Sequence, residues 1–183
     1  MLIGDYMMKD SYKIRAAELS DHLLLQALYE QVAGVPGGIA REYDEIDDQY
    51  IDTMLTSSLK NGIILVAQSD DKIVGSISAY KLQPRCFSHM LAGLTIGVDP
   101  EHQGCGIGRA LFTQLLSIVK QDWPTIARVE LMVRESNKKT ITFYESLGFK
   151  KEGYLEKRVM GVSDTLEADI CMGWMNSEYK PMK

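Results

Sequence analysis

The segment 94–109, LTIGVDPEHQGCGIGR, constrains the fold of this chain more than any other part of it. Its apolar start predicts a strand that ends at Val98, because Pro100 has no N–H group with which to continue strand pairing. Three glycines at alternate positions follow, and they allow the backbone to turn several N–H groups toward one point. That point lies at the start of a predicted helix, where free amides and the helix dipole favour an anion of phosphate size. The alternative is that the glycines only permit a tight strand-to-helix turn.

Two common nucleotide-binding sites do not fit these glycines. A triphosphate-binding loop ends in Gly-Lys-Ser or Gly-Lys-Thr, whereas the residues here are Gly108, Arg109 and Ala110. A dinucleotide-binding turn has the spacing G-x-G-x-x-G directly after its strand, whereas here the spacing is G-x-G-x-G and residues 99–103 intervene. Glu130 lies about 20 residues beyond the loop, where a ribose-binding acid belongs, so dinucleotide binding stays an alternative.

Hydrophobic periodicity predicts a mixed α/β chain of the α+β type. The strand at 90–98, the helix at 108–120 and the strand at 129–133 form one βαβ unit with parallel strands, and hairpins make the rest of the sheet antiparallel. We expect further strands at 12–16, 63–68, 72–80, 151–160 and 167–175, and further helices at 20–32, 44–59 and 137–147. The sum is a sheet of about six to seven strands with flanking helices.

Length and composition limit the class of protein. A chain of 183 residues, 45% apolar and 25% charged, predicts a single domain over 1–183 with a core at about 12–175 and loosely ordered ends at 1–11 and 177–183. The net charge of −5 without a basic run argues against nucleic-acid binding. No apolar run has the length of a membrane span and no leader pattern occurs, so we expect a cytoplasmic protein that does not bind membranes. Three widely spaced cysteines suggest neither a disulfide framework nor a metal site.

Two motifs together resemble the GNAT-type N-acetyltransferase family. The run 103–108, QGCGIG, is similar to that family's Q/R-x-x-G-x-G/A signature. Residues 135–137, ESN, followed by 143–149, FYESLGF, resemble the family's second cofactor-contacting segment. The order of predicted elements also agrees from about residue 12 to residue 175. The resemblance implies the GNAT-like acyl-CoA N-acyltransferase fold and transfer of an acetyl group from acetyl-CoA, without a metal, to a primary amine of a small molecule or a protein.

The resemblance also implies roles for individual residues. The main chain of Ile96, Gly97 and Val98 would bond the pantetheine arm of coenzyme A, with Gly97 at the β-bulge where the sheet begins to splay. Asn137 would contact the same arm, and Tyr144 would bind the cofactor and protonate the departing thiolate as general acid. The pyrophosphate would be held by the backbone amides of one continuous run: Gln103, Gly104, Cys105, Gly106, Ile107, Gly108 and Arg109.

The sequence offers several candidates for the general base. An alkyl amine with a pKa of about 10.4 must lose a proton before it can attack a thioester. Some family members carry a carboxylate on the strand before the glycine loop, but residues 91–98 contain neither Asp nor Glu. We therefore name Glu130 on the neighbouring strand as the base, with His89, Tyr80 or an ordered water as alternatives. The alternative for each of these three side chains is a purely structural role.

Two further patterns bear on the chemistry. Cys105 at a helix N-terminus could form an acyl-enzyme, although a loop position that binds pyrophosphate lies far along the cofactor from the thioester. Six acids near the loop 36–41 predict either an acidic rim that attracts cationic amines or a solvated helix face: Glu42, Asp44, Glu45, Asp47, Asp48 and Asp52.

Two other classes of function stay open. The missing strand carboxylate is compatible with a non-catalytic acyl-CoA-binding regulatory or interaction domain. Apolar residues of the final predicted hairpin, Ile170, Met172 and Trp174, could pair two chains as a homodimer. A dimer is also compatible with catalysis.

Overall fold

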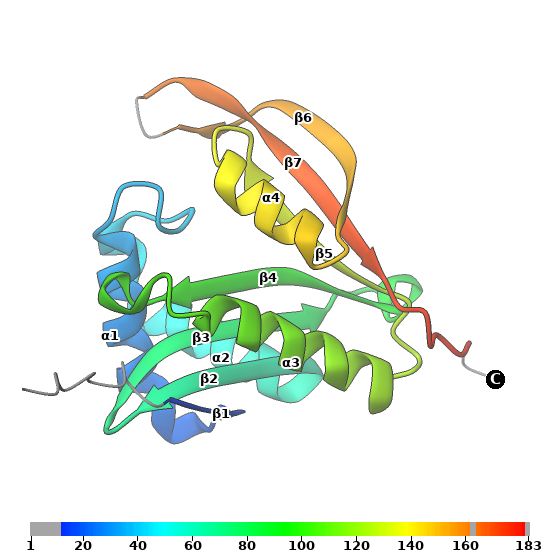
Figure 1. Cartoon of the computed structure of the whole chain (residues 1–183), viewed down its shortest axis with the longest axis horizontal. Helices are drawn as coiled ribbons and strands as arrows, with labels where there is room; N and C mark the ends of the chain where they lie inside the picture. Colours follow the sequence, from blue (N-terminus) through cyan, green and yellow to red (C-terminus); the bar gives the residue numbers. More distant parts are fainter. Residues whose placement is uncertain (1–11, 162–163, 182–183) are drawn as a thin grey trace, which may run out of the picture.

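One seven-stranded sheet organises the computed structural model, which describes residues 12–161 and 164–181. The strand order is β1-β2-β3-β4-β5-β7-β6 (Figure 1), and only β4 and β5 run parallel. The predicted α+β fold with a mostly antiparallel sheet is therefore confirmed. The strands are β1 (Lys13–Ala16), β2 (Gly62–Ser69), β3 (Lys72–Lys81), β4 (Met90–Val98), β5 (Arg128–Arg134), β6 (Lys150–Met160) and β7 (Leu166–Met175).

Helices cover both faces of this sheet. α1 (His22–Ala33) and α2 (Asp48–Asn61) pack on one face, while α3 (Ile107–Gln121) and α4 (Lys138–Ser146) pack on the other (Figure 1). Strand β2 shows why both layers form, because its successive residues are apolar and enter the two hydrophobic clusters alternately. No helix in the described part of the chain is long and apolar enough to cross a membrane.

The sheet splays between β4 and β5. These strands pair only at Met90 with Arg128 and at Leu91 with Val129, and beyond these pairs they diverge (Figure 1). The second half of β4 therefore keeps one edge without a neighbouring strand. This geometry agrees with the predicted opening of the sheet.

The β-bulge lies at Gly93, and the prediction that it lies at Gly97 was wrong. The register of β3 with β4 shifts between Ser78 and Tyr80, whereas Gly97 pairs regularly with Ser76. Gly93 adopts a left-handed φ of 60°. A Cβ at Gly97 would lie 3.1 Å from the Cε1 atom of Tyr29, so this glycine allows helix α1 to approach β4 closely.

Helix α2 begins later than predicted, at Asp48 rather than at Asp44. Residues Tyr43–Glu45 form a separate 3-10 turn, because Glu42 and Glu45 each accept the other's backbone N–H. Asp47 then caps α2 by accepting the N–H of Tyr50 over 2.7 Å. Only two of the six clustered acids therefore lie on the helix itself.

The final hairpin also differs from the prediction. Ile170, Met172 and Trp174 are 6%, 0% and 6% exposed, so they belong to the core of their own chain and cannot pair two chains. The segment after β7 is attached to the fold, since the N–H of Lys180 donates to the carbonyl of Pro124 over 2.8 Å. The predicted loose end at 1–11 lies outside the described residues.

Candidate active site

The loop after β4 is fixed by a buried carboxylate. Asp99 is 8% exposed and its Oδ1 accepts the N–H of Glu101 over 2.9 Å. Its Oδ2 lies 3.1 Å from Nδ1 of His102. These contacts close the short 3-10 turn Pro100–His102 and set the direction in which the chain enters the glycines.

The glycine loop exposes its backbone to open space. Gly104 and Gly106 have left-handed φ values of 80° and 84°, a conformation that other residues rarely adopt, and Gly106 is the N-cap residue of α3. No atom lies within 4 Å of a Cβ added at either position. Gly108 differs, because it lies inside α3 and a Cβ there would meet Ile96 and Val98 side chains at 3.8 Å. The first two glycines therefore shape a concave turn at a helix N-terminus, where an anion can approach main-chain amides.

A cavity of about 560 Å³ joins the two predicted motifs, and we call it the glycine-loop cavity. It is lined by all the predicted cofactor residues except Gly97 and Cys105: Ile96, Val98, Gln103, Gly104, Gly106, Ile107, Gly108, Arg109, Asn137 and Tyr144. Cys105 is half-buried and its thiol is 3.9 Å from the carbonyl of Gln103. The structure thus brings residues about 40 positions apart in sequence to one site.

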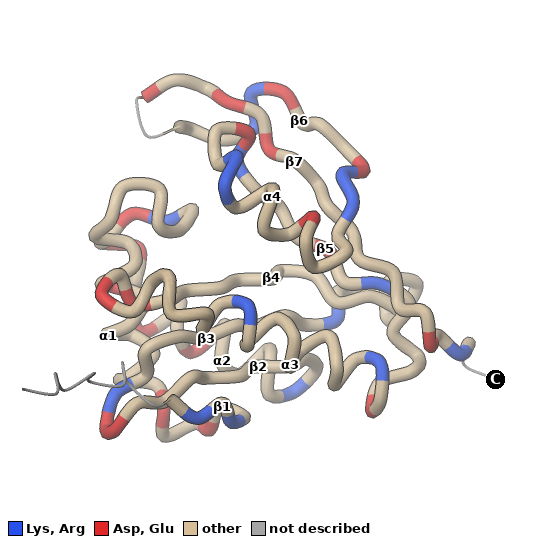
Figure 2. Tube along the Cα trace, viewed as in Figure 1, with Lys and Arg blue, Asp and Glu red and all other residues tan. Residues whose placement is uncertain are grey.

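Part of this cavity wall was not predicted. The loop 35–38 after α1 and the first turns of α4 contribute to it, including Lys139. Arg109 links the two helices, because its Nη2 donates to Oγ of Ser146 over 2.8 Å and its Cζ lies 5.3 Å from the centre of the Phe143 ring. Figure 2 shows Lys or Arg positions at the first turns of both α3 and α4. These charges favour an anionic ligand in the cavity.

Asn137 begins helix α4. Its Oδ1 accepts the backbone N–H of Thr140 over 3.2 Å, which is the geometry of an N-cap. The predicted cap is therefore present, and Asn137 also lines the glycine-loop cavity.

Tyr144 points from α4 into an aromatic cluster beside the cavity. Its ring centre lies 5.4 Å from that of Phe112 and 6.0 Å from that of Phe149. Burial raises the pKa of Tyr144 to about 12. The phenol is therefore protonated near neutral pH and can donate a hydrogen bond or a proton. The inward orientation predicted from the spacing with Ile141 is confirmed, since both side chains are buried.

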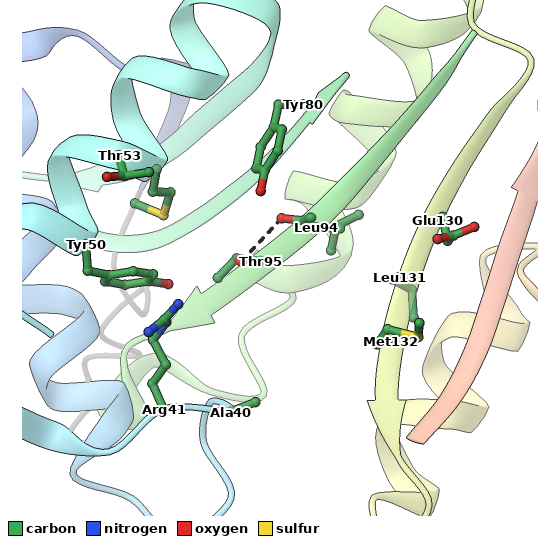
Figure 3. A pocket seen from close by; sticks show the side chains of 12 residues that line it. Ala40, Arg41, Tyr50, Thr53, Tyr80, Leu94, Thr95, Glu130, Leu131 and Met132 are labelled. Atoms are coloured by element: carbon green, nitrogen blue, oxygen red, sulfur yellow. Dashed lines mark hydrogen bonds between the residues drawn. The ribbon is translucent and has the colours of Figure 1, made fainter. Parts of the chain in front are cut away.

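A second cavity, of about 400 Å³, lies beside the splayed half of β4, and we call it the β4 pocket (Figure 3). Leu94 and Thr95 line it, whereas the next residue, Ile96, lines the glycine-loop cavity. Consecutive residues of one strand therefore line the two cavities. The other residues that line the β4 pocket are Ala40, Arg41, Tyr50, Thr53, Met54, Tyr80, Gly93, Glu130, Leu131 and Met132.

Glu130 is the one carboxylate that lines the β4 pocket among the described residues. Its Oε2 accepts a hydrogen bond from Nη2 of Arg128 over 3.0 Å, and the same nitrogen also binds Glu152. Of the alternative bases, Tyr80 lines the pocket and His89 does not. None of the six clustered acids lines either cavity.

Arg41, Tyr50 and Thr95 are pocket residues that sequence reasoning missed. They come from a loop, a helix and a strand, and Figure 3 shows their side chains close together. No local pattern marks any of the three. Only the packing of α2 against the sheet brings them to one place.

Comparisons with known proteins agree with this geometry. The chain is 44% identical over 69 residues to the N-alpha-acetyltransferase RimI of Mycobacterium tuberculosis, a match that covers 38% of this chain and 40% of that protein. It is 38% identical over 77 residues to the ribosomal protein bS18 alanine N-acetyltransferase of Escherichia coli, covering 42% of this chain and 50% of that protein. The matches therefore span half or less of these relatives.

A solved structure extends the likeness to the whole fold. The GNAT superfamily phosphinothricin acetyltransferase of Sinorhizobium meliloti, in complex with AcCoA, has a TM-score of 0.77 at 18% identity and covers 94% of each chain. At 18% identity, this similarity shows that the two proteins share a fold. The sequence model of the acetyltransferase (GNAT) family matches residues 20–149, which include the residues that line both cavities. Because this match covers well over half of the sequence, the chain belongs to the acetyltransferase (GNAT) family.

Proposed function

We propose that this protein transfers an acetyl group from acetyl-CoA to a primary amine. The observation that carries the proposal is that neighbouring residues of β4 line two cavities, one beside an open glycine turn and one beside the splayed strand edge. A pyrophosphate fits the first, because left-handed Gly104 and Gly106 leave its approach to the amides open. The acceptor amine would occupy the β4 pocket. The names of the relatives above support acetyl transfer as the reaction.

Individual residues of this chain would orient the cofactor and transfer protons. Bound acetyl-CoA supplies the reactive thioester. The free edge of β4 at Ile96 and Val98 would bind the cofactor arm and orient it toward the β4 pocket. Glu130 would take a proton from the acceptor ammonium, and Tyr144 would give its phenolic proton to the departing thiolate.

Direct attack by the amine is the route that the geometry favours. An acyl-enzyme on Cys105 would require that thiol to reach the thioester, yet Cys105 lines neither cavity. The thiol belongs to the turn that would hold the pyrophosphate. We therefore assign Cys105 to the loop rather than to the chemistry.

Thiol release from acetyl-CoA, measured against a broad panel of amines, tests the proposal. We expect turnover with at least one class of amine, and we expect Glu130→Gln and Tyr144→Phe each to lower kcat by about 10²- to 10⁴-fold. The variants should still bind coenzyme A in a calorimetric titration. Tight binding of acetyl-CoA without release by any amine would instead support the non-catalytic acyl-CoA-binding alternative.

We also propose a cytoplasmic location. The thiols of Cys86, Cys105 and Cys171 are all free, as is usual in a reducing compartment. A homodimer stays a prediction, and it would need a surface other than Ile170, Met172 and Trp174.

A further inference from the structure

A guanidinium lies at the β4 pocket, and no carboxylate in the described part of the chain forms an ion pair with it. Arg41 lines this pocket (Figure 3), and its Cζ atom lies 4.1 Å from the centre of the Tyr50 ring. Among the ion pairs of the described residues, none involves Arg41. Its positive charge is thus stacked on an aromatic side chain, and no described carboxylate neutralises it.

Three of the acids that follow Arg41 in sequence form hydrogen bonds with main-chain amides. Glu45 accepts the backbone N–H of Glu42 over 2.8 Å, and Glu42 accepts that of Glu45 in return. Asp47 accepts the N–H of Tyr50 over 2.7 Å. Three carboxylates that could have neutralised the guanidinium therefore bind main-chain amides instead.

The ring under Arg41 packs against the hydrophobic core. The Tyr50 ring packs edge-on against Tyr29, with 6.2 Å between the ring centres, and Tyr29 is completely buried in the core below α1 and α2. A guanidinium stacked on a fixed ring loses little further freedom when it binds a planar anion.

The rest of the pocket has opposite charge at its other side, and both apolar and hydroxyl-bearing side chains line the space between. Arg41 and Glu130 come from opposite sides of the pocket in Figure 3, and Leu94 and Thr95 of β4 lie between them. Leu131 and Met132 add further apolar surface. A ligand that fits this arrangement carries an anion, a cation and an apolar body.

We propose that the acceptor is an amine that also carries a carboxylate, of the class of a free amino acid with an apolar side chain, and that Arg41 binds its carboxylate. The proposal rests on the proposed function, because the amine of the same molecule must reach the thioester beside Glu130. Two parallel N–H···O bonds between a guanidinium and a carboxylate give strong and directional recognition. A polyamine would bring a second positive charge toward Arg41, and a lysine side chain of a protein would bring no carboxylate to pair with it, so the pocket disfavours both.

Matched acceptors test the role of the carboxylate. L-Leucine, L-leucinamide and 3-methylbutylamine share an apolar body and an amine, but only leucine carries a carboxylate; the methionine series gives a second set. We expect kcat/KM for the acid to exceed that for the amide by about 10-fold or more, although the amide amine is the weaker base and loses its proton more easily.

Variants of Arg41 connect this preference to one side chain. Arg41→Gln should lower kcat/KM for the amino acid about 10- to 100-fold, mostly through KM, and change that for the amide about 2-fold or less. Arg41→Lys should recover part of the loss, because it keeps the charge without the planar fork. Arg85→Gln, at an exposed arginine outside both cavities, is the control and should have no effect.

Each outcome of these measurements is informative. Equal use of acids, amides and simple amines, or an Arg41→Gln variant that weakens all three alike, would overturn the carboxylate proposal and leave the acetyltransferase proposal intact. If no amine supports thiol release, the acetyltransferase proposal is rejected, and the carboxylate proposal is rejected with it. An unchanged melting temperature for Arg41→Gln would show that its effect is not a loss of folding.

Discussion

The backbone N–H of Thr140 donates to Oδ1 of Asn137 over 3.2 Å, so the side chain that lines the glycine-loop cavity also starts helix α4. One residue therefore has two roles that substitutions can separate. An Asp at this position retains an oxygen that caps the helix but loses the amide hydrogens, while an Ala loses both.

We expect Asn137→Ala to lower the free energy of unfolding by about 1 kcal/mol, as for loss of an N-cap, and Asn137→Asp to change it much less. Both variants should raise KM for acetyl-CoA if the amide group meets the cofactor arm. Urea unfolding and steady-state kinetics measure the two effects. A normal KM in Asn137→Asp would limit Asn137 to the capping role.

Tyr144→Phe tests the general acid. The aromatic contacts with Phe112 and Phe149 survive in this variant, so its melting temperature should change little. We expect kcat to fall about 10²- to 10⁴-fold, because the donor to the thiolate is lost, while KM for acetyl-CoA stays similar. Since burial raises the pKa of Tyr144 to about 12, its deprotonation should not limit kcat near pH 10.

Tyr154→Phe is the matched control for that substitution. The Tyr154 hydroxyl donates to Oε2 of Glu135 over 2.6 Å at an exposed position outside both cavities. Its removal should leave kcat unchanged. Equal losses in the Tyr144 and Tyr154 variants would show that kcat responds to general weakening of the fold rather than to a proton donor.

Gly106→Ala should weaken both folding and cofactor binding. Its φ of 84° costs an alanine about 1–2 kcal/mol, although no atom lies within 4 Å of the added Cβ. The strain can relax only if the turn changes shape, which would misalign the amides that we assign to the pyrophosphate. Thermal unfolding and calorimetric titration with coenzyme A measure the two losses.

Gly34→Ala is the control for Gly106→Ala. Gly34 has a helical φ of −66° and its added Cβ would meet no atom closer than 3.4 Å. We expect this variant to be as stable as the parent protein or slightly more stable. If it loses as much affinity for coenzyme A as Gly106→Ala does, the left-handed turn is not what the cofactor requires.

The parts of the structure that follow from local sequence could be predicted. Helix α3 was expected at 108–120 and spans Ile107–Gln121, because its two apolar rows specify both the helix and its buried side. The glycine loop was predicted for a similar reason. Neighbouring residues in one segment supply all its amides, so the order of residue types encodes the geometry directly.

The errors arose where tertiary packing decides between similar local patterns. Gly93 and Gly97 lie four positions apart in one strand, and either could have formed the bulge. A Cβ at Gly93 would lie 2.6 Å from Cζ of Tyr80, and one at Gly97 would meet Tyr29, so contacts distant in sequence assign a different role to each glycine. Glu130 and Tyr80 of the β4 pocket were named from the sequence as candidate bases, but Arg41 was given no role, because it becomes notable only when α2 brings Tyr50 beneath it.

A buried ion pair at the start of α1 leads to a prediction about stability. Arg15 donates from Nη1 to Oδ2 and from Nη2 to Oδ1 of Asp21, both over 2.7 Å, and the N–H of Glu18 also donates to Oδ2 over 2.8 Å. The hydrogen bond from Arg15 lowers the pKa of Asp21 below its usual value, although burial acts in the opposite direction. The folded protein thus favours the ionised carboxylate.

Asp21→Asn should lower the free energy of unfolding near pH 7 by about 1–3 kcal/mol, because it removes the charge of an almost fully buried side chain that accepts hydrogen bonds from Arg15. A lowered pKa means that the stabilisation is fully present above the pKa of the unfolded state, about 3.9, and is lost as the pH falls through the folded value. The difference between parent and variant should therefore shrink progressively below about pH 4. Urea unfolding at a series of pH values measures it, with Asp71→Asn at an exposed aspartate as the control. A difference that stays constant down to the lowest pH at which the protein folds would mean that Asp21 contributes through shape rather than through its charge.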